Sequence, residues 1–349
     1  MRTNHLIRGG ASQFGVGDRL YQDQQAAKKR RAEFEETLLL PGRELPEETF
    51  QVPTSSGSGF GAATSSKAKA AQLAEALSYK GVIRLNGCLK RETARALRLL
   101  ILDEMERARE AISIGEMDAF SVLGMEPERK SRTDFKVSLV RRGETEGETV
   151  FSHPVADALN ELFGENGILR SLYNVIAGDN GLMYDLGCMT TQPGSPRQTI
   201  HTDFPWQPIP PIYSVYVALQ DVTAEMGPTV FFPRTNNPKD HGEWKRPATF
   251  DDYLREKTPK FALLKKGDLI VYDPLVLHCG AANLLETGAV RSLFNVGFRN
   301  PKVQGDFGYG GSMRPGYQGQ MTFGQLKKCL SRYKKGTSVD PFAKYGNGL

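Results

Sequence analysis

Residues 212–220 read IYSVYVALQ and residues 229–233 read TVFFP, with a turn signal at Gly227-Pro228 between them. Both stretches are rich in β-branched and aromatic residues, which favour strands. Many short strands in close succession predict an all-β barrel or sandwich core rather than alternating βαβ units. The other strand-like stretches, also bounded by turn residues, are 181–189, 198–203, 269–272 and 291–299.

Helical patterns flank this β-rich region. Residues 67–79 are rich in Ala and Leu, and residues 91–112 carry apolar residues at helical spacing. A shorter helical pattern covers residues 154–163. A β-branched segment at 81–85 and an alternating segment at 132–139 predict two more strands. The expected fold class is therefore mainly β with α.

Composition shifts along the chain predict three regions. Residues 1–66 form an N-terminal extension, partly helical, that ends in a flexible linker containing SSGSGFG. The compact domain spans residues 67–300 and includes a charged insertion near 234–266, which is longer than a normal hairpin loop. Residues 301–349 form a C-terminal tail or cover.

Composition also excludes several classes of protein. The chain has 349 residues, 39% hydrophobic and 24% charged, which is ordinary for a globular protein. Residues 1–25 lack a hydrophobic core segment and no apolar run is long enough for a transmembrane helix, so we expect no signal peptide and, by default, a cytoplasmic location. The net charge of +5 is too small to favour nucleic-acid binding. Its four isolated cysteines argue against a disulfide framework or a structural zinc site. We expect no membrane association, and a monomer is the favoured state.

Two of the five histidines stand where metal chemistry needs them. His201 and Asp203 end a strand-like stretch, and residues two apart on a strand point to the same side. His278 follows another strand-like stretch. Two histidines and one carboxylate form the facial triad of non-haem Fe(II) oxygenases. Taken alone the pattern is weak, because the pair is equally explained as a surface or capping pair and His278 as a core residue.

Arg291 strengthens the pattern. It begins the strand-like stretch that follows His278. A guanidinium is a planar fork that matches a carboxylate in bidentate geometry. An iron oxygenase that uses a keto acid needs such a group to hold the far carboxylate. The alternative is a solvent-facing strand end.

Taken together, these stretches resemble the phytanoyl-CoA dioxygenase family of Fe(II)/2-oxoglutarate oxygenases. The resemblance covers roughly residues 68–300, and the combination of motifs is more specific than any one of them. The matching stretches are QPGSPRQTIHTD at 192–203, EMGPTVFFPRT at 225–235, KGDLIVYD at 266–273, His278 with Arg291, and KGVIRLNGCL at 80–89.

The resemblance implies a double-stranded β-helix, or jelly roll, with helices packed on one side. It implies His201, Asp203 and His278 as ligands of Fe(II), and Arg291 as the partner of the 2-oxoglutarate C5 carboxylate. O₂ is the second co-substrate, and succinate and CO₂ are released. The sequence departs from the family at residues 234–236, where members usually carry a histidine. The residues that match the lining of the co-substrate pocket are Gln198, Tyr216, Met183, Thr229 and Lys136.

The resemblance also implies oxidation of a C–H bond in a small molecule, by hydroxylation, desaturation or oxidative cyclisation. Asp203 argues against halogenation, because halogenating relatives have a small residue at this position. Cationic side chains near the pocket would suit a substrate with carboxylates, such as an amino-acid-derived natural product of the kainoid-precursor kind. The same charges are also compatible with a solvent-facing role. The candidate substrate-binding residues are Arg132, Asp134, Arg197 and Trp206.

Three alternatives remain open at the level of sequence. The substrate can be a fatty acyl-CoA or another lipid, for which Lys265-Lys266 offers a basic surface. The fold can be a non-catalytic jelly-roll module that only binds a ligand. It can also be a cupin-type enzyme that uses a different metal and no keto acid, in which case Arg291 would be dispensable.

Overall fold

The computed structural model describes most of the chain from residue 63 onward. The N-terminal extension expected at residues 1–66 lies almost entirely outside the described residues, and its SSGSGFG sequence lies wholly outside them. No helix of the described residues is long and apolar enough to cross a membrane. The described residues are Gln25, Lys29, 63–124, 131–139, 153–246, 250–305, 311–335, 340–346 and 348, with the backbone alone for 63–66 and 251.

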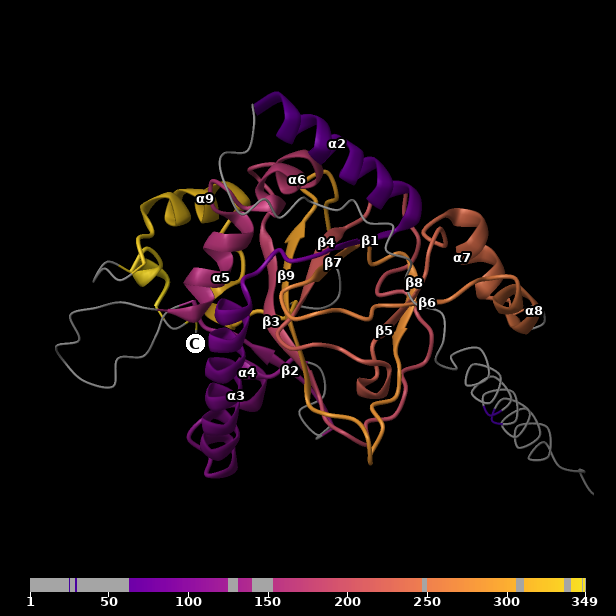
Figure 1. The fold of residues 1–349 in the computed structure, drawn as a ribbon, viewed down its shortest axis with the longest axis horizontal. Coiled ribbons are helices and arrows are strands. Elements are labelled where there is room, and N and C mark those ends of the chain that lie inside the picture. Colours follow the sequence, from indigo (N-terminus) through magenta and orange to yellow (C-terminus); the bar gives the residue numbers. More distant parts are fainter. Residues whose placement is uncertain are drawn as a thin grey trace, which may run out of the picture.

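Two antiparallel sheets form the centre of the molecule (Figure 1). The larger has the strand order β1-β7-β4-β9-β3-β2, and the smaller has the order β6-β5-β8. This two-sheet core with flanking helices confirms the fold class, mainly β with α. The strands are β1 (Val82–Leu85), β2 (Arg132–Lys136), β3 (Met183–Thr191), β4 (Ile212–Ala218), β5 (Thr229–Phe232), β6 (Lys260–Phe261), β7 (Leu269–Tyr272), β8 (Leu277–Gly280) and β9 (Arg291–Arg299).

The two faces of the larger sheet differ in chemistry. One face carries apolar side chains, such as Phe135 and Phe294, which pack into the main core cluster together with the helices. The opposite face, here called the inner face, looks toward the smaller sheet, because Phe231 of β5 contacts Tyr272 of β7 at a ring-centroid distance of 5.5 Å. Alternation along the strands places polar side chains on this inner face, among them Arg291.

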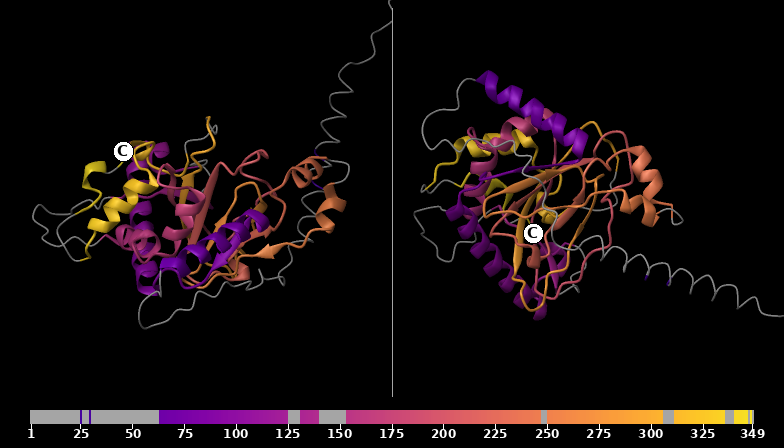
Figure 2. Two further views of the ribbon diagram at one scale, coloured as in Figure 1. Left: turned by 90° about the horizontal axis from the view of Figure 1, so that it is seen from above. Right: turned by 45° about the vertical axis from the view of Figure 1, so that its right-hand side comes forward.

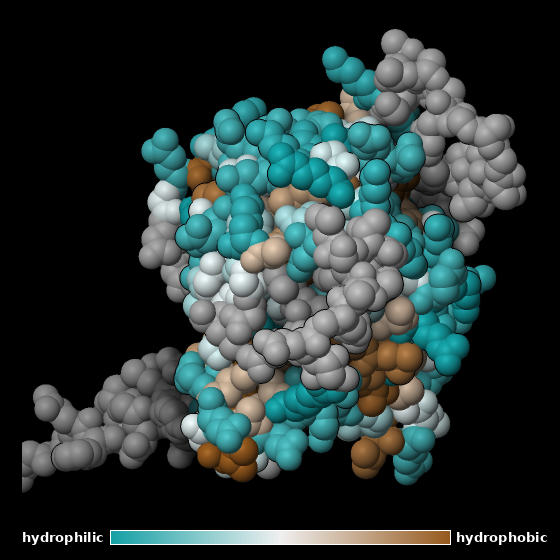
Figure 3. All heavy atoms as spheres, turned by 90° about the vertical axis from the view of Figure 1, so that its left-hand side faces the viewer, coloured by the Kyte–Doolittle hydropathy of each residue, from teal (hydrophilic) through white to brown (hydrophobic). Residues whose placement is uncertain are grey.

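Most helices cover the outer face of the larger sheet, whereas α7 and α8 lie beside the smaller sheet, as two further views show (Figure 2). The helices on the outer face bury apolar stripes there, as α3 does with Leu97 and Ile101. On the surface that α3 and α9 form, hydrophobic side chains are scattered among hydrophilic ones (Figure 3). The α-helices are α2 (Ala63–Lys80), α3 (Arg91–Ser113), α4 (Ala119–Val122), α5 (Pro154–Phe163), α6 (Ile168–Ile176), α7 (Pro238–Trp244), α8 (Phe250–Arg255) and α9 (Phe323–Arg332).

The structure differs from the sequence prediction in several places, among them strand β8, which carries His278 and was not expected. The strand expected at 198–203 is absent, and only an isolated bridge at His201 remains. Pro196 and Pro205 flank this segment and lack the backbone N–H groups that a continuous ladder needs. Helix α6 was not predicted. In the expected C-terminal tail, α9 packs into the main core through Phe323 and Leu326.

Candidate metal and co-substrate site

Backbone pairing brings the two candidate histidine ligands together. His278 lies on β8, and His201 lies in the connection between β3 and β4. Each donates its backbone N–H to the carbonyl of the other at 2.9 Å, as in an antiparallel bridge. The side chains of such a pair lie on the same face, and the two imidazole centroids are 4.5 Å apart.

Asp203 completes the group from two residues beyond His201. Its backbone N–H donates to the Pro274 carbonyl at 3.0 Å, which holds the residue against the segment that leads into β8. Its Oδ1 atom lies 3.6 Å from His201 Nε2 and 3.5 Å from His278 Nε2. Metal–ligand bonds of about 2.1 Å allow atoms this far apart to share one ion. The three predicted ligands therefore lie together.

Hydrogen bonds fix the tautomers of both imidazoles. His201 Nδ1 lies 2.7 Å from the Thr199 carbonyl, and His278 Nδ1 lies 2.9 Å from the Val276 carbonyl. A carbonyl only accepts, so each Nδ1 must be the donor. Each Nε2 then presents its lone pair toward Asp203. Metal-bound histidines are oriented in this way in proteins, so the donor set fits a divalent cation with preference for nitrogen and oxygen ligands.

Charge coupling agrees with this geometry. Burial lowers the pKa of His278, but the Asp203 carboxylate raises it by more, and the net shift is upward. Burial raises the pKa of Asp203, but the two histidines together hold it well below its ordinary value. The carboxylate is therefore charged at neutral pH, as a metal ligand must be.

Aromatic side chains surround the three ligands. The Tyr272 hydroxyl donates to Asp203 Oδ2 at 3.2 Å, so one carboxylate oxygen is held by the fold while Oδ1 faces the histidines. Phe231 stacks on the His278 ring with centroids 5.7 Å apart. Tyr216 stacks on Tyr272 at 5.5 Å. Tyr272 was not among the predicted site residues, although the strand pattern places it on the same face of β7 as Ile270.

We expect Tyr272→Phe to weaken divalent metal binding by about 10-fold, because outer-shell hydrogen bonds to a ligating carboxylate contribute on that scale. The measurement is a Co(II) titration followed by absorbance. Tyr213→Phe is the matched control. Tyr213 is the cross-strand partner of Phe298 on the outer face of the sheet, and it contacts none of the three ligands in the described structure. Equal metal affinity in wild type and Tyr272→Phe would contradict this role.

Arg291 is a buried guanidinium, 2% exposed, at the start of β9. Its Nη2 atom donates to Thr191 Oγ1 at 3.0 Å and its Nη1 atom donates to the Gly227 carbonyl. Its Nε atom has no partner, and no carboxylate of the described residues forms an ion pair with it. Burial, followed by the nearby charge of Arg132, lowers its pKa to about 9. A buried cation without a carboxylate partner fits an anionic ligand.

Arg132 lies beside this guanidinium. Register pairs Arg132 with Thr191 and Thr191 with Arg291, so all three share the inner face. A methyl group built on Gly280 would lie 2.8 Å from Gln198 Oε1 and 3.2 Å from Arg132 Nη2. Arg132 and Gln198 therefore lie near one another. Thr229, another predicted lining residue, is the strand partner of Gly280.

Two predicted lining residues lie elsewhere. Met183 belongs to the main core cluster on the helix side of the sheet, because a bulge between Met183 and Asp185 changes the face on which it points. Lys136 is on the inner face, but its ammonium donates to the Phe120 carbonyl at 2.7 Å. This bond directs the side chain toward α4 and away from the subsite around Arg291.

The remaining predicted substrate contacts are dispersed. Arg197 donates to the Gln198 carbonyl at 2.7 Å. Trp206 is 36% exposed and follows Asp203 in the chain, so it is available to a ligand. Asp134 is buried on the inner face.

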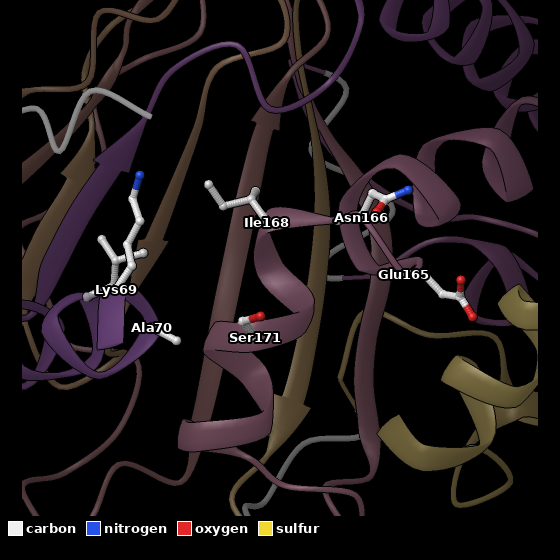
Figure 4. Close-up of a pocket in the computed structure, with 8 residues that line it drawn as sticks. Lys69, Ala70, Glu165, Asn166, Ile168 and Ser171 are labelled. Carbon is white, nitrogen blue, oxygen red and sulfur yellow. The ribbon is translucent and has the colours of Figure 1, made fainter. Parts of the chain in front are cut away.

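A separate cavity of about 120 Å³ lies between α2 and α6 (Figure 4). Lys69 and Ala70 of α2 line it on one side, and Ile168 and Ser171 of α6 line it on the other. None of the metal-site residues takes part in it, so it is not the site of the chemistry discussed above.

Comparison with known proteins agrees with this site. Residues 83–291 match the family model described as phytanoyl-CoA dioxygenase (PhyH). No curated protein is similar enough in sequence to match.

Several solved structures are similar to the chain. The non-heme alpha ketoglutarate dependent epimerase SnoN from nogalamycin biosynthesis is 17% identical, with a TM-score of 0.44, covering 69% of this chain and 92% of that one. The carbocyclase SnoK from the same biosynthesis is 13% identical, with a TM-score of 0.44 and coverages of 66% and 83%. HygX from Streptomyces hygroscopicus, with nickel and 2-oxoglutarate bound, is 12% identical, with a TM-score of 0.43 and coverages of 64% and 85%.

Proposed function

The chain belongs to the phytanoyl-CoA dioxygenase family and is a non-haem Fe(II)/2-oxoglutarate-dependent enzyme, and on this premise we propose that it oxidises a C–H bond of a small amino-acid-derived metabolite. The outcome is hydroxylation, desaturation or oxidative cyclisation, with succinate and CO₂ as the co-products. His201, Asp203 and His278 hold the iron in this proposal.

The observation that carries the site assignment is the orientation of the imidazoles. Both Nδ1 atoms are committed to backbone carbonyls, and both Nε2 atoms face Asp203 Oδ1 within 3.6 Å. Neither a surface histidine–carboxylate pair nor a single core histidine explains why two imidazoles, each bonded through Nδ1 to a backbone carbonyl, face the same carboxylate oxygen. Bound iron supplies the oxidising chemistry that these side chains lack.

The protein side chains bind and orient in this proposal. Arg291 pairs with the C5 carboxylate of 2-oxoglutarate, and its unpartnered Nε gains an acceptor. Arg132 adds a second positive charge to the same subsite, so in this proposal it contributes to binding 2-oxoglutarate and not the substrate. Tyr272 holds Asp203 Oδ2, so that Oδ1 remains directed at the metal position. Trp206 provides an aromatic surface for the substrate.

The test uses the metal-to-ligand absorption band of the anaerobic complex. Fe(II) and 2-oxoglutarate added to the full chain should produce this band, and an accepted metabolite should shift it. Admission of air should then release succinate in proportion to oxidised product. Absence of the band at saturating Fe(II) and 2-oxoglutarate would overturn the proposed site.

A further inference from the structure

Two buried side chains on the inner face each carry an oxygen without a hydrogen-bond donor. They are Asp134 on β2 and Asn295 on β9, both 4% exposed, and the unpartnered atom is Oδ1 in each. Buried acceptors in folded proteins are nearly always paired. An orphaned pair beside a ligand site therefore calls for a donor that arrives with a ligand.

The two oxygens approach one point next to Gly187 on β3. A methyl group built on Gly187 would lie 2.8 Å from Asn295 Oδ1 and 3.2 Å from Asp134 Oδ1. Gly187 is the cross-strand partner of Asn295, so the missing side chain at this position allows the oxygens to come together. One donor group can serve both of them.

The surroundings of this pair favour a cation. Burial, and to a smaller degree the neighbouring carboxylate of Asp185, raise the pKa of Asp134 to about 6 although Ser312 acts in the opposite direction, and a cation bound here would favour the ionised carboxylate. Ser312 donates to Asp134 through its hydroxyl and to Asp185 through its backbone N–H at 2.8 Å. The Lys136 ammonium on the same strand is taken up by a backbone carbonyl. Hydrogen bonds from a charged donor to a carboxylate are the stronger kind.

The orphaned pair, Asp134 and Asn295, lies on the inner face next to residues that border the metal site. Asn295 is the cross-strand partner of Tyr216, which is half-buried. Tyr216 stacks on Tyr272, whose hydroxyl bonds Asp203. Met189 is the cross-strand partner of the β2 member of the pair and is also half-buried. A molecule over Tyr216 therefore has one end near the metal position and the other near the acceptors.

We propose that Asp134 and Asn295 bind the protonated amine of the substrate. This proposal rests on the proposed function and adds the substrate class, a primary or secondary amine. Both acceptor atoms are closed to solvent in the unliganded fold, so amine entry requires the flexible Met189 side chain to move aside. Charge is then divided along the inner face: Arg132 and Arg291 receive carboxylates, and Asp134 together with the neutral Asn295 receives the ammonium.

The experiment titrates amines into the anaerobic Fe(II)/2-oxoglutarate complex of the full chain by calorimetry. The probes are L-proline, L-lysine and L-glutamate, each compared with its N-acetyl derivative, which lacks the charge. We expect at least one free amine to bind about 10-fold more tightly than its acetylated form. Asn295→Leu and the conservative Asp134→Asn should each bring this ratio from about 10 to about 1 or 2, while 2-oxoglutarate affinity changes less than about 2-fold.

The controls separate this proposal from the proposed function. Asn166→Leu, in the cavity between α2 and α6, should leave amine binding unchanged. Gly187→Ala tests the shared region independently, since its methyl group would crowd both oxygens at 2.8 and 3.2 Å and leave less room for a donor between them, so it should also abolish the amine preference. If the metal-to-ligand band forms but no amine binds more tightly than its acetylated form, the amine subsite is wrong. If the band itself does not form, the proposed function fails, and this inference fails with it.

Discussion

Arg291→Gln is expected to raise the 2-oxoglutarate concentration needed for half-maximal turnover by roughly 30-fold or more, which corresponds to about 2 kcal/mol. The reason is burial. The guanidinium is 2% exposed and has no carboxylate partner among the described residues, so the co-substrate carboxylate would be the group that pairs with it. Glutamine keeps a donor to Gly227 or Thr191 but removes the charge.

Succinate release at varied 2-oxoglutarate measures this effect. Arg255→Gln is the control, because Arg255 pairs with Asp252 on the exposed side of α8. The charge-specific part of the result is separated by Arg291→Lys, which should fall between wild type and Arg291→Gln because it keeps the charge and loses the fork. An unchanged 2-oxoglutarate requirement in Arg291→Gln would favour a cupin-type enzyme that uses no keto acid.

Asp203→Ala is expected to abolish tight divalent metal binding and to reduce succinate formation by about 1000-fold or more. The carboxylate is the one anion between two neutral imidazoles, and its Oδ1 atom lies within 3.6 Å of both Nε2 atoms. Its removal leaves two nitrogen ligands and no compensating charge. A Co(II) titration followed by absorbance, run beside the succinate assay, separates lost metal from lost turnover.

Asp252→Asn serves as the matched control, because it removes an exposed carboxylate in α8. Circular dichroism of Asp203→Ala should match wild type, since the Asp203 anchor to Pro274 uses its backbone N–H and survives the substitution. Wild-type metal affinity in Asp203→Ala would place the metal elsewhere.

Strand periodicity predicted most of the core correctly. The stretches at 212–220, 229–233, 269–272 and 291–299 became β4, β5, β7 and β9, because alternating or β-branched runs bounded by turns have few other ways to bury their apolar side. The grouping of His201 with Asp203 was also visible locally. The meeting of His201 with His278 depends on pairing between residues 77 positions apart in the sequence, which only the family resemblance supplied.

The predicted lining residues that lie apart from Arg291 do so for local physical reasons. Met183 was assigned to the pocket by position, but one irregularity in the β3–β9 register reverses the side on which it points. Lys136 is on the correct face, and a backbone carbonyl of α4 captures its ammonium. Asn295 was not among the predicted residues. Its proposed role in amine binding rests on an unpaired oxygen beside a glycine on another strand, and no pattern within one stretch of sequence reveals such a pair.

The reciprocal backbone bonds between His201 and His278 connect the two histidines before any ion arrives. An ion bound there would link the side chains of β8 to the connection that leads into β4, in addition to these backbone bonds. Ligands that bind only the native state stabilise it in proportion to their occupancy. The thermal stability of this region would then depend on the supply of iron. When iron is scarce, the cell would lose folded protein as well as catalytic activity.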